Sequence, residues 1–201
     1  QVLLNERSEF IQNVSHQLKT PLTIIYNDLV SNEKFEFKKN DITREVQHLI
    51  KVVENLLLLS QIDALKVLPM KRENTFEVLS ESIDLIALKA REKKVSIKVD
   101  LDEQLIENLY LLERFSLPEL LKSAFVNILD NAVDFSPEGG SIEIDISYKN
   151  DHTIIKIQDH GPGVNPQFAP HIFARFARDR AHERKGSGLG LAISKKIIDL
   201  H

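Results

Sequence analysis

Residues 10–29 read FIQNVSHQLKTPLTIIYNDL, and the spacing of their apolar side chains predicts a long amphipathic helix. The apolar positions step by three or four along one helical face: Phe10, Val14, Leu18, Leu22, Ile25 and Leu29. Pro21 lies inside this stripe, so we expect a bend or a missing backbone hydrogen bond there. At 100° per residue the stripe centres about 170° from His16, which predicts an imidazole that points to solvent. Thr20, four residues on, shares that solvent-facing side.

A second apolar stripe with the same period follows a polar interruption over residues 31–41. Its members are Ile42, Val46, Leu49, Ile50, Val53, Leu56 and Leu57. Two amphipathic helices with a short connection predict an antiparallel hairpin. Because one hairpin leaves a long apolar face uncovered, we expect two copies to pair into a four-helix bundle.

The rest of the chain alternates between helix and strand patterns. Composition changes after Asp63 and Leu68-Pro69 disfavours a helix, so we place a domain boundary between residues 66 and 67. The later patterns predict a helix over 75–94, a strand over 95–101, a helix from 118 to about 135, a hairpin of 141–148 with 153–158, a loop over 164–185 and a helix over 189–200. Ser116 to Glu119 has the pattern of a capping box for the second of these helices. The predicted fold class is α+β: a helical hairpin in 1–66, then an α/β domain with a mostly antiparallel sheet in 67–201.

Composition excludes several classes of function. The 201 residues suffice for one or two domains, and the net charge of −4 comes from interspersed acids and bases. We therefore expect neither a nucleic-acid surface nor a polybasic membrane patch. The chain has no cysteine, which excludes disulfides and thiolate chemistry, and its seven histidines are scattered, which disfavours zinc. No apolar run approaches the ~20 residues of a membrane span. If the protein is anchored in a membrane, we expect the anchor to lie outside this chain.

Three short motifs in the second part suit a nucleotide. Asn127 and Asn131 are four residues apart on one predicted helix face, and amide oxygens suit hard cations such as Mg²⁺. The sequence DHGPG at 159–163 follows a predicted strand, and its glycines allow a flat ligand to approach the backbone. The sequence GSGLGL at 186–191 opens a predicted helix, where backbone N–H groups bind anions. Taken singly, the asparagine pair is better explained as helix-capping or surface residues, and DHGPG is equally well explained as an ordinary turn after a strand. The glycine segment has the spacing G-x-G-x-G, which is not the dinucleotide-binding G-x-G-x-x-G.

A lone exposed histidine usually has no special role, but the surroundings of His16 change this interpretation. Residues 10–22, FIQNVSHQLKTPL, resemble the phosphoacceptor motif of bacterial sensor histidine kinases, F-x-x-x-x-S-H-E-L-R-T-P-L. The resemblance implies that His16 is the phosphorylated residue and that Thr20 helps to orient water during dephosphorylation of the partner. The family usually has an acidic residue after the histidine as general base, whereas this chain has Gln17, whose amide takes no proton at neutral pH.

In this order, the three later motifs resemble the ATP-binding domain of histidine kinases, which is shared in outline with gyrase-type and Hsp90-type ATPases. The resemblance implies that Asn131 binds Mg²⁺ with Asn127 beside it, and that Asp159 reads the adenine amino group. It also implies that Gly161 and Gly163 shape the adenine floor. The same resemblance assigns the phosphate loop to the following residues: Gly186, Gly188, Leu189 and Gly190.

The region between these glycine motifs is similar to the mobile lid that covers ATP in this family. Within residues 164–185, Phe173 and Phe176 would anchor the lid, and Arg178 would meet the terminal phosphate. A solvated loop arginine is the plainer interpretation of Arg178. Beyond Asn131 the family commonly has Lys or Arg and then an aromatic, where this chain has Asp134 and Phe135.

The resemblance implies a kinase that transfers the γ-phosphate of ATP to His16, and then to an aspartate on the receiver domain of a response regulator. It implies a homodimer that uses ATP and Mg²⁺, in the cytoplasmic portion of a membrane-anchored bacterial protein. The family continues past residue 201 with two more strands, so we expect a shortened domain with an open sheet edge. Two alternatives stay open: a phosphatase-type signalling protein with weak kinase activity, and a non-catalytic dimeric nucleotide-binding scaffold.

Overall fold

The computed structural model describes residues 2–30, 39–64, 69–178 and 187–201. The chain forms two compact units, of which the first contains residues 1–64 and 174–189 and the second residues 65–173 and 190–201. The boundary predicted between residues 66 and 67 falls outside the described residues and stays a prediction. None of the helices in the described part of the chain is long and apolar enough to cross a membrane.

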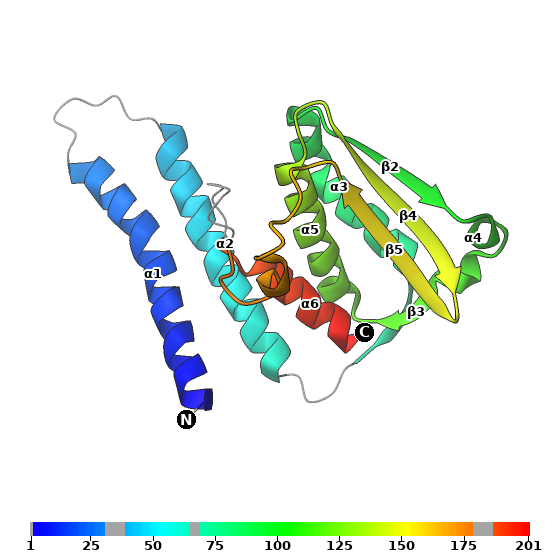
Figure 1. Cartoon of the computed structure of the whole chain (residues 1–201), viewed down its shortest axis with the longest axis horizontal. Coiled ribbons are helices and arrows are strands. Elements are labelled where there is room, and N and C mark those ends of the chain that lie inside the picture. The colour runs from blue at the N-terminus through cyan, green and yellow to red at the C-terminus, as the bar shows by residue number, and fades with distance from the viewer. Residues whose placement is uncertain (1, 31–38, 65–68, 179–186) are drawn as a thin grey trace. The chain divides into compact units, whose positions relative to one another are not determined.

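The first unit contains a hairpin of two long helices, α1 (Val2–Val30) and α2 (Lys39–Ala64). They run side by side in opposite directions (Figure 1). Helix α1 continues through Pro21, whose ring is buried and which has no N–H to donate to the carbonyl oxygen of Gln17. The antiparallel hairpin predicted from the two stripes is therefore confirmed.

Helix α2 has apolar residues over more than one face, and the hairpin buries only part of them. Its buried positions are Glu45, Val52, Asn55, Leu59 and Ile62, spaced by seven, three, four and three residues. Four members of the predicted stripe are instead exposed: Val46, Ile50, Val53 and Leu57. The hairpin thus leaves an apolar face of α2 uncovered, as expected from the two stripes, because a single neighbouring helix covers only one sector of α2.

The second unit is built on a three-stranded sheet in the order β2-β4-β5. Strand β2 (Ser96–Leu101) pairs in parallel with β4 (Ser141–Lys149), and β4 pairs antiparallel with β5 (His152–Asp159). Asn150 and Asp151, both at positive φ, form the tight turn between β4 and β5. The predicted hairpin is confirmed, but the prediction of a mostly antiparallel sheet was wrong for these three strands, because β2 pairs with β4 in parallel.

Three helices pack with this sheet: α3 (Thr75–Glu92), α5 (Pro118–Phe135) and α6 (Gly190–Leu200). Helix α5 lies between α3 and α6 and contacts both, and the sheet lies against this helical layer (Figure 1). Every second residue of β4 points into the core, where Ile142, Ile144 and Ile146 are almost fully buried. They meet apolar side chains of the helices, including Leu79, Leu129 and Val133.

Several short elements were not predicted. Strands β1 (Lys71–Asn74) and β3 (Glu113–Ser116) form a separate antiparallel pair, and α4 (Glu103–Glu107) precedes a 3₁₀ turn at Leu109–Leu112. A second 3₁₀ turn, Ala169–His171, interrupts the predicted loop. Four-residue strands with the sequences KREN and ERFS are mostly charged, so they carry no hydrophobic alternation that would reveal them.

The two long helices of the second unit begin in different ways. Asn74 caps α3, because its Oδ1 accepts hydrogen bonds from the N–H groups of Phe76 (2.9 Å) and Glu77 (3.4 Å). The capping box predicted for α5 was wrong: Ser116 ends β3, and the cap residue Leu117 forms no side-chain cap. The N–H of Leu117 instead donates to Nε2 of His201 (2.9 Å), a partner 84 residues away that no local pattern indicates.

Candidate functional site

The predicted phosphoacceptor lies on the solvent side of α1. His16 is exposed, as its position opposite the apolar stripe predicted, and Gln17 is half-buried. The hydroxyl of Thr20 donates to the backbone carbonyl oxygen of His16 (3.1 Å), one turn earlier. Since this bond uses the hydroxyl proton, the oxygen of Thr20 can still accept a hydrogen bond from water. An exposed imidazole with a hydroxyl one turn away can serve as a nucleophile that two partners reach in succession.

The two asparagines of α5 lie on its polar side, next to the start of α6. Asn127 is buried and Asn131 is half-buried, and they project about 40° apart around the helix axis. A Cβ placed on Gly190, the first residue of α6, would lie 3.5 Å from Oδ1 of Asn127. The structure thus brings Asn127 close to Gly190, the last glycine of the predicted phosphate loop. Amide oxygens beside a helix N-terminus suit a hard cation and the phosphates that share it.

The DHGPG segment folds back against the C-terminal end of α5. Oδ1 of Asp159 accepts a hydrogen bond from the N–H of Gly161 (2.8 Å), and Nδ1 of His160 bonds to the carbonyl oxygen of Ser141 (3.0 Å). A Cβ on Gly161 would lie only 2.7 Å from the carbonyl oxygen of Phe135, so only glycine fits. Because Asp159 is exposed, its carboxylate can accept a further hydrogen bond from a ligand amino group. Asp159, Gly161 and Phe135 therefore lie close together in the second unit.

The next glycine, Gly163, has a φ of +75°, which L side chains rarely adopt, and open space lies where its Cβ would be. It follows Gly161 in an exposed loop. The role of Gly161 and Gly163 as an adenine floor stays a prediction.

The lid and the phosphate loop meet in the first unit. The N–H of Phe176 donates to the carbonyl oxygen of Gly188 (2.8 Å), and both residues have positive φ. A Cβ on Gly188 would lie 2.7 Å from the backbone carbon of Phe176, so this close approach requires glycine. Leu189, which follows, is fully buried. Gly186 lies outside the described residues.

Side chains at the start of the lid pack against the hairpin within this first unit. The ring of Phe176 lies 5.8 Å from that of Phe10, centroid to centroid, and the guanidinium of Arg175 lies over Phe10 and 3.5 Å from the carboxylate of Asp63. Asn55 also lies 3.5 Å from the hydroxyl of Ser187. Phe176 is thus anchored by another aromatic ring.

Two of the residues predicted in the lid lie at the surface. Phe173 and Arg178 are both exposed in the structure. Exposure leaves the guanidinium of Arg178 accessible to a phosphate group, whereas the ring of Phe173 is less enclosed than that of Phe176.

Comparisons with known proteins assign both parts of the chain. Residues 6–65 match the His Kinase A (phospho-acceptor) domain, and residues 116–201 match the histidine kinase-, DNA gyrase B- and HSP90-like ATPase domain. The chain belongs to the histidine kinase family. Membership of that ATPase family implies an ATP-binding site within residues 116–201.

Two relatives align with almost the whole of this chain. The chain is 30% identical to the sensor protein KdpD of Clostridium acetobutylicum over 97% of its own length, but it covers 22% of that protein. It is 32% identical to the heme sensor protein HssS of Staphylococcus aureus, again over 97% of the chain and 42% of the relative. The chain thus spans less than half the length of these relatives.

A solved histidine kinase, ThkA in complex with the response regulator TrrA, is similar over 98% of this chain and 55% of the other, with a TM-score of 0.76 and 22% identity. At that identity, the likeness concerns the fold. The predicted fold class, a helical hairpin followed by an α/β domain of the histidine kinase, gyrase and Hsp90 type, is confirmed.

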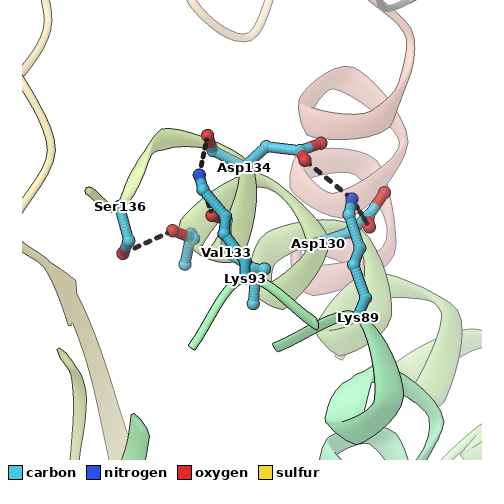
Figure 2. A network of polar contacts seen from close by, with 7 residues as sticks. Lys89, Lys93, Asp130, Val133, Asp134 and Ser136 are labelled. Carbon is cyan, nitrogen blue, oxygen red and sulfur yellow. Dashed lines mark hydrogen bonds and ion pairs between the residues drawn. The ribbon is translucent and has the colours of Figure 1, made fainter. Parts of the chain in front are cut away.

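A network of charged residues links α3 to the C-terminal half of α5 in this histidine kinase (Figure 2). Nζ of Lys89 lies 2.9 Å from Oδ1 of Asp134 and also pairs with the carboxylate of Asp130. Nζ of Lys93 donates to the backbone carbonyl oxygens of Val133 (2.8 Å) and Asp134 (2.7 Å). Lys89 thus pairs with two carboxylates one turn apart on α5, while Lys93, at the C-cap of α3, binds backbone carbonyl oxygens of α5.

Sequence reasoning missed these two lysines. The spacing of Asp130 and Asp134 was a usable signal, because like charges four residues apart destabilise a helix unless a cation lies near them. Nothing local, however, indicates which lysine of the chain compensates the charges of Asp130 and Asp134.

Among the residues predicted for the site, the structure brings Asn127 close to Gly190 and Phe135 close to Gly161, whereas His16 and Thr20 belong to the other unit.

Proposed function

We propose that this chain is the catalytic core of a sensor histidine kinase, which uses ATP to phosphorylate His16 and then passes the phosphoryl group to an aspartate of a response-regulator receiver domain. The observation that carries the proposal is the exposed His16 within a phosphoacceptor domain, followed by an ATPase domain of the histidine kinase type. Each domain alone would suit other functions, and their order favours this one.

The reaction requires a nucleophile, a polarised phosphoryl group and a proton acceptor. A neutral imidazole nitrogen of His16 attacks the γ-phosphorus, the bond from that phosphorus to the β,γ-bridging oxygen breaks, and ADP leaves. The N–H proton of the imidazole passes to water or to a neighbouring base, because the amide of Gln17 cannot take it. The receiver-domain carboxylate then attacks the phosphoryl group of His16, which regenerates the imidazole. The protein contributes mainly positioning and charge neutralisation.

We assign the nucleotide contacts as the motifs imply. Asn131, with Asn127 beside it, holds Mg²⁺, and Asp159 accepts from the adenine amino group. Gly161 and Gly163 form the floor beneath the ring, with Phe135 at its edge. Arg178 contacts the terminal phosphate. The remaining phosphate contacts come from the loop residues Gly186, Gly188, Leu189 and Gly190. The exposed carboxylate of Asp159 and the close approach of Gly190 to Asn127 support these roles.

We further propose that the chain works as a homodimer and as the cytoplasmic portion of a membrane-anchored bacterial sensor. The exposed apolar residues of α2 support dimerisation, because a second hairpin would cover them. The ThkA structure, in which a histidine kinase is bound to a response regulator, supports a receiver domain as partner.

A phosphatase-type function is the second candidate. Gln17 favours it, because an amide at this position cannot act as the general base of the kinase reaction, while the chain keeps Thr20.

Labelling with ATP tests the kinase function. The chain is incubated with γ-labelled ATP and Mg²⁺, and the label is then tested for stability in acid and in base. We expect an acid-labile, base-stable label that disappears in His16→Gln, because phosphohistidine is hydrolysed in acid. His48→Gln, on α2, is the matched control and should keep the label. No label on the parent, together with dephosphorylation of a phosphorylated receiver domain, would favour the phosphatase. No activity of either kind would favour a scaffold.

Calorimetry tests the adenine assignment. We expect Asp159→Ala to weaken ATP binding at least about fivefold, since leaving the adenine amino group without its acceptor costs about 1–3 kcal/mol. Asp145→Ala is the matched control: it removes the same charge from the exposed side of the neighbouring strand, where Asp145 pairs with Lys156 at 3.5 Å. Equal ATP affinity of Asp159→Ala and the parent would contradict the role of Asp159.

A further inference from the structure

The polar side of α5 combines the proposed magnesium ligand with two carboxylates. Around the helix axis, Asp134 projects about 20° and Asp130 about 60° from Asn127, both on the side away from Asn131. Asp134 is therefore about 60° from Asn131, and Asp130 about 100°. A triphosphate held at Asn131 would therefore approach two negative charges. Without compensation, their repulsion would oppose binding of the phosphates.

Lys89 supplies this compensation from α3. Its ammonium group lies 2.9 Å from Oδ1 of Asp134 and contacts the carboxylate of Asp130, so one cation bridges both acids (Figure 2). Burial opposes the charge on the ammonium group, but hydrogen bonds to Asp130 and Asp134 and the charges of both outweigh it and raise the pKa of Lys89. The lysine is therefore charged at neutral pH.

Lys93 fixes the two helices in the arrangement that this bridge needs. Its ammonium group binds the carbonyl oxygens of Val133 and Asp134, which belong to the last turn of α5. A cation there is favoured by the negative end of the helix dipole. Because Lys93 lies one turn beyond Lys89 on the same helix, its contacts hold Lys89 opposite Asp130 and Asp134.

We propose that Lys89 is a positioning residue for the nucleotide: by pairing with Asp130 and Asp134, it reduces the negative charge of α5 beside Asn131 and lets the phosphates of ATP approach. This inference rests on the proposed ATP site. A purely structural ion pair is the competing interpretation, and the chain contains one between the same helices. Nζ of Lys122 on α5 lies 2.5 Å from the carboxylate of Glu81 on α3. Lys122 is nine residues from Asn131, which is about 14 Å along a helix.

The test compares ATP with adenosine, which lacks phosphates, on the full chain. We expect Lys89→Gln to weaken ATP binding about three- to tenfold, as for one charge near a partly exposed site, and to leave adenosine binding unchanged. Lys122→Gln, the matched control, should bind both ligands as the parent does. Calorimetry measures ATP, and an NMR titration measures the weaker adenosine.

Two further measurements separate electrostatics from folding. Lys89→Gln combined with Asp134→Asn restores the parent's net charge at this face, so we expect it to regain the parent's ATP affinity. Raising the salt concentration from about 0.1 M to about 1 M shortens the Debye length from about 10 Å to about 3 Å and should shrink the effect of Lys89→Gln. If Lys89→Gln does not fold, Asp134→Asn alone decides: it should bind ATP at least as tightly as the parent.

Several results would overturn the inference. An equal loss of ATP and adenosine binding in Lys89→Gln would show that Lys89 has a structural role. Unchanged ATP binding would show that Lys89 has no effect on the binding of the phosphates. Weaker ATP binding by Asp134→Asn would show that Asp134 itself contacts the cation or the nucleotide. A parent that binds no ATP would overturn the proposed function together with this inference, whereas a parent that binds ATP leaves the two questions separate.

Discussion

Gln17 follows the proposed phosphoacceptor, at a position where the motif that residues 10–22 resemble has a glutamate. Its amide accepts a hydrogen bond but cannot remove the imidazole proton as His16 attacks phosphorus. The side chain is half-buried beside an exposed His16, so a carboxylate would fit at the same place without a new cavity. At the scale of the residue, we expect Gln17 to affect the rate of the chemical step rather than the affinity for ATP.

We therefore predict that Gln17→Glu raises the initial rate of His16 labelling at saturating ATP. General-base assistance is typically worth about 10²–10⁴-fold, and we expect the lower end, because a nitrogen of neutral imidazole already attacks without deprotonation. ATP affinity, measured by calorimetry, should not change. Gln47→Glu, an exposed position on α2, is the matched control and should label like the parent. An unchanged rate in Gln17→Glu would shift attention to Asp134.

At the scale of the element, the two long helices that carry the site are anchored differently at their starts. Helix α3, which presents Lys89 and Lys93, has a local side-chain cap in Asn74. Helix α5, which presents the asparagines, has none and is tied at Leu117 to His201, whose Nδ1 bonds to the carbonyl oxygen of Ile197 (2.7 Å). Since the last turn of α6 holds the start of α5, the position of α5 depends on contacts that are distant in sequence.

We predict that Asn74→Ala lowers the free energy of unfolding by about 1 kcal/mol, because two N–H groups in the first turn of α3 lose their acceptor. Asn74→Asp keeps an acceptor oxygen and should remain within a few tenths of a kcal/mol of the parent. Urea unfolding of the full chain, followed by circular dichroism, measures both. Equal midpoints for Asn74→Ala and Asn74→Asp would show that solvent replaces the cap.

At the scale of the whole molecule, the exposed apolar residues of α2 remain to be covered. Val46, Ile50, Val53 and Leu57 are each at least 40% exposed and recur every three or four residues. A stripe of this length on a helix is typical of an interface rather than of scattered surface residues. A second copy of the hairpin offers the same stripe and would complete a four-helix bundle.

We predict that the parent chain sediments as a dimer at tens of micromolar, an order of magnitude that suits an interface of ordinary size. Ile50→Glu should shift it towards monomer, because a carboxylate would lose its hydration in the interface. Leu85→Glu is the matched control, since Leu85 is 63% exposed on α3 and lies outside the hairpin. A parent that stays monomeric, or a dimer that Ile50→Glu leaves intact, would place the interface elsewhere.

Much of the fold followed from local patterns. The hairpin of α1 and α2, the exposure of His16, the full extent of α5 and the turn between β4 and β5 all have periodicity or turn residues that act within a few positions. The site predictions rested on motifs, and the structure shows why two of their glycines are needed: Gly161 leaves room for the carbonyl oxygen of Phe135, and Gly188 for the backbone of Phe176.

The sequence by itself determined the long helices, the strands β2, β4 and β5, the exposure of His16 and the family to which the motifs point, because these properties depend on residues that are neighbours along the chain. Only the tertiary structure decided that α2 buries Val52 and Leu59 rather than Ile50, that His201 binds the start of α5, and that Lys89 neutralises Asp130 and Asp134. Each of these depends on partners 40 or more residues apart or on which sector of a helix meets its neighbour. Packing decides such pairings, and a one-dimensional pattern does not contain them.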